Sequence, residues 1–119
     1  MITIYHNPRC SKSRETLALV EAAAQQLGEP VEIVEYLKTP PAVSVLRQLH
    51  ALLGLPVREM VRSNEAIYSE LGLDDAGLTD AELLAAVADH PILLQRPIVV
   101  RKQRAAIGRP PENVAALFD

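Results

Sequence analysis

The chemistry of this sequence centres on Cys10, the only cysteine among its 119 residues. It follows the strand-breaking run His-Asn-Pro at 6–8 and precedes an apolar segment of helical periodicity, so we expect it at the start of a helix. A helix N-terminus presents unpaired N–H groups and the positive end of the helix dipole, which both favour a thiolate. Arg9, Lys12 and Arg14 add positive charge nearby. The sequence therefore predicts a nucleophilic thiolate rather than an inert buried thiol.

Ser13 stands where a dithiol redox motif has its second cysteine. Cys10 therefore has no internal partner, and any redox cycle must take its second thiol from another molecule. The backbone N–H groups from Ser11 to Arg14 also favour the binding of a tetrahedral anion, because helix starts bind phosphate in the same way. His6 either adds positive charge or holds the loop through hydrogen bonds. We expect a thiolate beside an oxyanion-binding site.

Three further arginines, Arg62, Arg96 and Arg109, stand beside helix breaks or strand starts. Guanidinium groups suit oxyanions because they donate paired hydrogen bonds, although each arginine could also be ordinary surface charge. Arg96 precedes Pro97, and a cis proline at the start of a strand beside the thiol is a feature of thioredoxin folds. The cationic run at 101–104 is instead predicted to be a solvated hairpin tip.

The predicted elements follow the order of a thioredoxin-like sheet: βαβ, a helical middle, then ββα. Strands are expected at 2–5, 31–36, 97–100 and 105–108. Helices are expected at 12–28, at 39–54 beginning with Thr39-Pro40-Pro41, as two or three short segments between 57 and 90 with a capping box at Thr79 and Glu82, and at 112–117. We expect one α/β domain over residues 1–119, with a four-stranded mixed sheet and a helical insertion at about 41–90.

Composition narrows the function classes. The formal charge of −3 argues against a general nucleic-acid-binding role, because such proteins carry an excess of Lys and Arg. No apolar run approaches the roughly 20 residues of a membrane span, and no signal peptide opens the chain, so we expect a cytoplasmic protein without a membrane partner. One cysteine and three histidines at no ligand-like spacing give little support for a metal site.

Short segments through nearly the whole chain form one series. The series is HNPRCSKSR at 6–14, YLKTPP at 36–41, Arg62, ELGL at 70–73, HPIL at 90–93, RPIVV at 96–100 and GRPP at 108–111. In this order they resemble the glutaredoxin-coupled arsenate reductase (ArsC) family. Because the chain ends at Asp119, it resembles the short branch of that family.

The resemblance implies a thioredoxin-like fold with Cys10 as nucleophile and with His6 and Ser13 tuning the thiolate. It also implies that Arg62, Arg96 and Arg109 surround a bound oxyanion. In this scheme the thiolate attacks the arsenic of arsenate, glutathione attacks the adduct as a co-substrate, and glutaredoxin resolves the mixed disulfide while arsenite is released. No cofactor would be bound.

Two other functions stay open at this point. A monothiol glutaredoxin-like enzyme would act on glutathione mixed disulfides, with the arginines holding a glutathione carboxylate. A non-enzymatic Spx-like regulator would bind a partner protein such as RNA polymerase, although that class typically uses a Cys-x-x-Cys switch, which this sequence lacks. Mixed-disulfide reduction without arsenate would favour the first, and a stable protein partner retained irrespective of Cys10 would favour the second.

Overall fold

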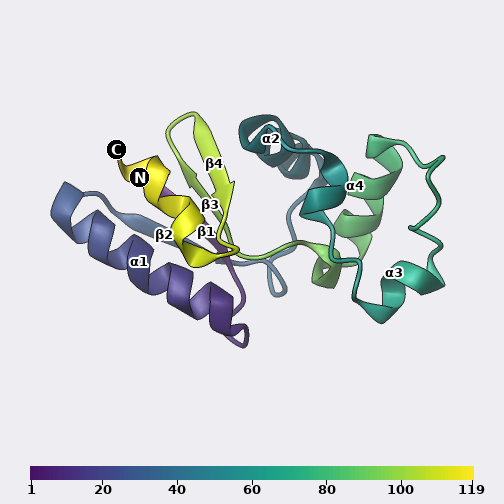
Figure 1. The fold of residues 1–119 in the computed structure, drawn as a ribbon, viewed down its shortest axis with the longest axis horizontal. Helices are drawn as coiled ribbons and strands as arrows, with labels where there is room; N and C mark the ends of the chain where they lie inside the picture. The colour runs from purple at the N-terminus through teal and green to yellow at the C-terminus, as the bar shows by residue number, and fades with distance from the viewer. The chain divides into compact units, whose positions relative to one another are not determined.

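The computed structural model describes residues 1–119 and divides them into two compact units. The first unit combines Met1–Thr39 with Arg96–Asp119, and the second is Pro40–Gln95. In Figure 1 the first unit runs from purple to blue and again from yellow-green to yellow, whereas the second, in teal and green, is built from helices.

A mixed sheet of four strands, in the order β2-β1-β3-β4, forms the centre of the first unit. The strands are β1 (Ile2–His6), β2 (Val31–Glu35), β3 (Ile98–Arg101) and β4 (Arg104–Ile107). β1 pairs in parallel with β2 and antiparallel with β3, and β3 pairs antiparallel with β4. The helix α1 (Ser11–Leu27) joins the parallel pair, as such a connection requires. The predicted α/β fold with its βαβ and ββα halves is confirmed.

One face of this sheet is covered by α1 and by the 3-10 helix η3 (Pro111–Phe118), which pack against each other in front of the strands in Figure 1. Buried apolar side chains from the sheet and both helices form one cluster: Ile2, Ile4, Val20, Ala24, Val99, Val114 and Leu117. Each valine or isoleucine buried in this way contributes about 1.5–3 kcal/mol. Gly28 ends α1 in the left-handed conformation, at φ 67°, which favours glycine. This core fixes the helix whose first turn follows Cys10.

Arg101 contradicts the prediction of a solvated hairpin tip. It is only 7% exposed, its guanidinium contacts the carboxylate of Glu29, and its Nη1 donates to the carbonyl oxygen of Leu117 at 2.8 Å. The pairing of β3 with β4 leaves only Lys102 and Gln103 in the turn. Arg101 therefore lies within a strand, where it ties the end of η3 to the segment that follows α1.

The second unit consists of short helices. They are α2 (Val43–Leu53), the 3-10 turn η1 (Val57–Met60), α3 (Ala66–Glu70), α4 (Asp80–Asp89) and the 3-10 turn η2 (Pro91–Leu93). α2 packs against α4. α4 begins with the predicted capping box, in which Thr79 and Glu82 each accept the other's backbone N–H. No helix in the chain has both the length and the apolar character needed to cross a membrane.

The start of α2 differs from the prediction. The helix begins at Val43 with Ala42 as its N-cap, so Thr39-Pro40-Pro41 lies outside it. A residue that precedes a proline is disfavoured in the helical region of backbone space. With two consecutive prolines, both Thr39 and Pro40 carry this restriction, which delays the helix.

Candidate active site

Cys10 occupies the N-cap position of α1, where the chain leaves the end of β1. Asn7 shapes this connection: its carbonyl oxygen accepts the N–H of Cys10 at 3.0 Å, and its Oδ1 accepts the N–H of Arg9 at 3.0 Å. The sequence predicts Asn7 as part of the strand break at 6–8, because Asn followed by Pro favours a turn, but it does not predict these bonds. These bonds determine where the backbone turns into the helix, and so where the thiol lies.

His6 and Ser13 connect the end of β1 to the first turn of α1. His6 Nδ1 and Ser13 Oγ form a buried hydrogen bond of 2.7 Å, and the same Oγ accepts the N–H of Asn7 at 3.0 Å. Burial lowers the pKa of His6, and the charge of Glu35 opposes this effect only in part. A neutral imidazole is thus favoured, and the pair holds the backbone on either side of Cys10.

Two arginines from the last quarter of the chain reach the thiol. Arg109 Nη2 lies 3.6 Å from Cys10 Sγ, and Arg109 Nε donates to the carbonyl oxygen of Arg96 at 2.8 Å. The side chain of Arg96 also hydrogen-bonds the Cys10 sulfur. Both arginines precede a cis peptide bond, Arg96–Pro97 and Arg109–Pro110. The structure therefore brings Arg96, Arg109 and the cis residue Pro97 to the end of the sheet that carries Cys10.

The pKa of the Cys10 thiol is lowered from its ordinary value. Burial alone raises this pKa, but the backbone N–H of Ser13, the hydrogen bond and charge of Arg96, and the backbone N–H of Lys12 together outweigh it. It is the ionised sulfur that gains from these donors, as expected at a helix start.

The side chains of the predicted anion cradle have other partners. Lys12 pairs with Glu15 at 3.6 Å, and Arg14 Nη1 donates to the carbonyl oxygen of Pro8 at 3.0 Å. Ser11 is exposed at the first position of α1. The part of Ser11, Lys12 and Arg14 in binding an oxyanion stays a prediction.

Arg62 belongs to the second unit. Its Nε pairs with Glu65 Oε1 at 3.3 Å, and its backbone N–H donates to the carbonyl oxygen of Leu93 at 2.7 Å. Both contacts lie within the helical unit. The place of Arg62 beside the oxyanion stays a prediction.

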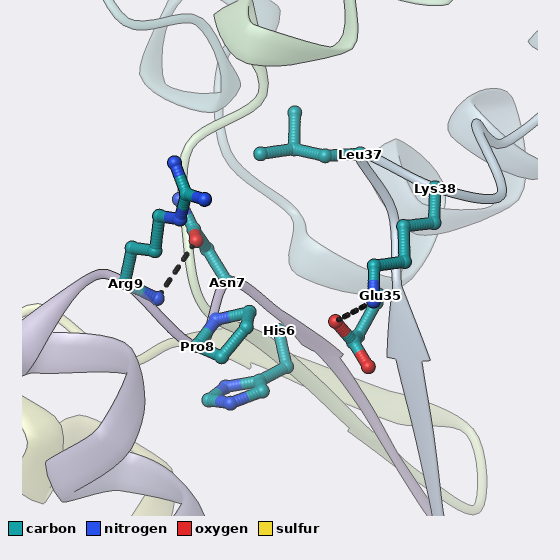
Figure 2. Close-up of a pocket in the computed structure, with 7 residues that line it drawn as sticks. All are labelled: His6, Asn7, Pro8, Arg9, Glu35, Leu37 and Lys38. Carbon is teal, nitrogen blue, oxygen red and sulfur yellow. Dashed lines mark hydrogen bonds and ion pairs between the residues drawn. The ribbon is translucent and has the colours of Figure 1, made fainter.

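A hollow of about 190 Å³ lies beside the turn that leads to Cys10. Its lining side chains come from residues 6–9 and from the end of β2: His6, Asn7, Pro8, Arg9, Glu35, Leu37 and Lys38. Figure 2 shows Arg9 on one side of it and Glu35 and Lys38 on the other, with Pro8 and His6 between them. The nucleophile thus has arginines on one flank and a small hollow beside the turn that precedes it.

The site combines a sulfur nucleophile with guanidinium groups. No group of three or more His, Cys, Asp or Glu side chains in the chain could hold a metal ion. A thiolate can attack an electrophilic centre, and arginines can neutralise the oxygens of an anionic one in a partly dry site. The arrangement suits nucleophilic attack on the central atom of an oxyanion.

Comparison with known proteins points the same way. The family model described as "ArsC family" matches residues 5–117. A protein named arsenate reductase from Neisseria meningitidis serogroup B is 50% identical over 98% of this chain and 97% of its own length, and one from Haemophilus influenzae is 45% identical over 98% of each. A solved structure named as an arsenate reductase from Vibrio cholerae aligns with a TM-score of 0.89 at 49% identity, covering 98% of this chain and 96% of that one. The chain belongs to the ArsC family.

Proposed function

We propose that this protein reduces arsenate to arsenite, with the Cys10 thiolate as its nucleophile. The observation that carries the proposal is the contact of Cys10 Sγ with Arg109 and Arg96, which gives a sulfur of lowered pKa a cationic setting. Arsenate has the geometry and charge that such a setting favours. Several members of the same family are named arsenate reductases, which supports this substrate.

In the first step the Cys10 sulfur attacks arsenic, an S–As bond forms, and an oxygen leaves as water after protonation. Arg96 and Arg109 neutralise the remaining oxygens, the backbone N–H groups of Ser11 and Lys12 donate to them, and Arg62 supplies a third guanidinium. His6 and Ser13 hold the turn rather than taking part in the bond changes.

In the second step an external thiol attacks the adduct. The electron pair of the S–As bond passes to arsenic, which is reduced from As(V) to As(III), and the two sulfurs end as a disulfide. The lone cysteine of the chain requires this outside thiol, for which we propose glutathione, with glutaredoxin reducing the resulting mixed disulfide. The reducing cytoplasm supplies both.

The test is arsenate-dependent oxidation of reduced glutathione with glutaredoxin present, comparing wild type with two matched variants. Arg96→Ala removes a charge that contacts the thiol, whereas Arg104→Ala removes an exposed charge at the start of β4. Losing one charge-assisted hydrogen bond costs about 1.5–3 kcal/mol, or roughly 10- to 150-fold in kcat/KM. Arg104→Ala should stay near wild type. No turnover of wild type with any thiol donor would overturn the proposal.

A further inference from the structure

Neither step of the proposed reaction uses the hollow beside the turn that leads to Cys10. One wall is residues 6–9, the four residues directly before Cys10, and the other is the end of β2 with Leu37 and Lys38. The strand order places β2 on one side of β1 and β3 on the other. Arg96, which contacts the thiol, lies just before β3. The hollow and the oxyanion-binding arginines therefore flank the end of β1 from opposite sides.

The lining of the hollow combines apolar surface with separated charges. Pro8 and Leu37 are apolar and exposed, and Leu37 leaves 45% of its surface open. Arg9 supplies a cation on one wall, and Lys38 and Glu35 supply a cation and an anion on the other (Figure 2). The Lys38–Glu35 pair, at 3.5 Å, is largely solvated. Such an exposed pair is worth little, so either member can exchange its partner for a ligand group.

The size of the hollow limits its occupant. Drug-sized ligands occupy pockets of roughly 300–1,000 Å³, so a hollow of about 190 Å³ suits part of a small molecule rather than a folded partner. An occupant with carboxylates and an ammonium group would match the two cations and Glu35. Arg9, which lines the hollow, directly precedes Cys10 in the chain, so the hollow adjoins the residue that carries the sulfur.

We propose that this hollow binds one end of the low-molecular-weight thiol peptide that attacks the Cys10–arsenic adduct, a zwitterion of the glutathione type. The proposal rests on the function above, in which Cys10 needs an external thiol. Arg9 and Lys38 hold carboxylates of the peptide, Glu35 holds its ammonium group, and Pro8 and Leu37 pack against its backbone. The donor thus approaches the sulfur from the β2 side while the oxyanion occupies the β3 side.

Thiol–disulfide exchange tests this site without arsenate. In the reaction with oxidised glutathione the Cys10 thiolate attacks one sulfur, the glutathione disulfide bond breaks, the second glutathione leaves as a thiolate, and a Cys10–glutathione mixed disulfide remains. The same thiolate reacts with hydroxyethyl disulfide, which is uncharged and offers nothing to Arg9, Lys38 or Glu35. The readout is the ratio of the two rate constants, because any change in the reactivity of the sulfur itself cancels in that ratio.

The variants are Lys38→Gln, Arg9→Gln and, as a matched control, Lys102→Gln. Lys102 is exposed in the β3–β4 turn, which the strand register places at the other end of the sheet. Lys38→Gln and Arg9→Gln should each lower the ratio about two- to fivefold, the range of an exposed charge pair. The reduction should shrink at high salt. Lys102→Gln should leave the ratio as in wild type.

A ratio that stays unchanged in both pocket variants, or falls equally in Lys102→Gln, would overturn the site. If the ratio stays unchanged but reduction of the mixed disulfide by glutaredoxin slows, the hollow contacts the protein partner and the proposal is wrong. If wild type turns over arsenate but the pocket substitutions leave the ratio unchanged, the thiol site is wrong and the proposed function stands. If wild type turns over no arsenate but the ratio falls as expected in the two pocket variants, the thiol site stands and arsenate is not the substrate.

Discussion

Arg109 Nη2 lies 3.6 Å from Cys10 Sγ, although 99 residues separate the two side chains in sequence. The guanidinium cannot rotate freely, because its Nε donates to the carbonyl oxygen of Arg96 at 2.8 Å. Arg96 itself hydrogen-bonds the same sulfur. The chain thus closes the site by bringing the residue before each of two strand-end prolines to a thiol at the start of α1.

Replacing Arg109 with Gln should slow the reaction of Cys10 with iodoacetamide at neutral pH. The loss of a guanidinium from the sulfur destabilises the thiolate and raises the pKa of the thiol relative to wild type. For a partly solvated contact we expect roughly 1 kcal/mol, about fivefold in rate. Arg104→Gln serves as the matched control, and a wild-type rate in Arg109→Gln would show that the contact does not stabilise the thiolate.

Ser13→Ala should destabilise the fold more than Ser11→Ala, although both lie in the first turn of α1. Ser13 is fully buried, and its hydroxyl bonds His6 Nδ1 and the N–H of Asn7. Leaving buried polar partners unsatisfied costs about 1–3 kcal/mol, whereas exposed Ser11 should change the free energy of unfolding by less than about 0.5 kcal/mol. Urea denaturation measures both, and equal effects would contradict the assigned hydrogen bonds.

Gly108→Ala should disturb the packing behind the site. A Cβ at this position would lie 2.5 Å from Thr16 Oγ1 and 2.9 Å from a carbon of Pro97. Overpacking of this kind costs about 1–3 kcal/mol. In Gly77→Ala the added atom would meet nothing closer than 3.2 Å, so that variant is the control.

The clash at Gly108 should be relieved in part by a second substitution. Thr16→Ala removes the nearest side-chain atoms, so the double variant should lose less stability than the sum of the two single variants. Simple additivity in thermal or urea unfolding would mean that the two residues are not in contact.

The ion pair between Glu29 and Arg101 should make stability depend on pH in the acid range. The hydrogen bonds from Arg101 hold the pKa of Glu29 below its ordinary value, because they outweigh the effect of burial. A carboxyl with a depressed folded-state pKa contributes stability above its unfolded pKa of about 4.3, and the contribution is lost as pH falls through the folded value. Wild type should therefore lose its advantage in Tm over Glu29→Gln in this window. A constant difference in Tm at all pH values would contradict the pairing.

The sequence predicted the parts of the fold that depend on local pattern. The short β-prone run at 2–5, the helical periodicity after Cys10 and the capping box at Thr79 predict their elements correctly, because each is set by residues within one or two turns. The predicted start of α2 is wrong, because two consecutive prolines restrict the residues before them instead of forming the first turn of the helix.

Local sequence pattern predicts less of the contacts between distant parts of the chain. The burial of Arg101 does not follow from local pattern, because its partners, Glu29 and Leu117, are distant in sequence and become neighbours only when the sheet forms. The sequence pattern places Asn7 only in a strand break, because the bonds that its backbone and its Oδ1 form depend on how the turn folds. The position of Cys10 could be predicted, since a strand break followed by a helix start is a local signal.

The most direct test of the central claim is the rate of Cys10 alkylation by iodoacetamide as a function of pH, measured with and without arsenate. A thiolate held by Arg96, Arg109 and the start of α1 should react well below the ordinary thiol pKa of about 8.5, and arsenate should slow the reaction by occupying the sulfur and its arginines. Sulfate should protect less than arsenate, because it offers no centre for the sulfur to attack. Alkylation that begins only near pH ~8.5 and is unaffected by arsenate would contradict the claim that Cys10 is an activated nucleophile for this oxyanion.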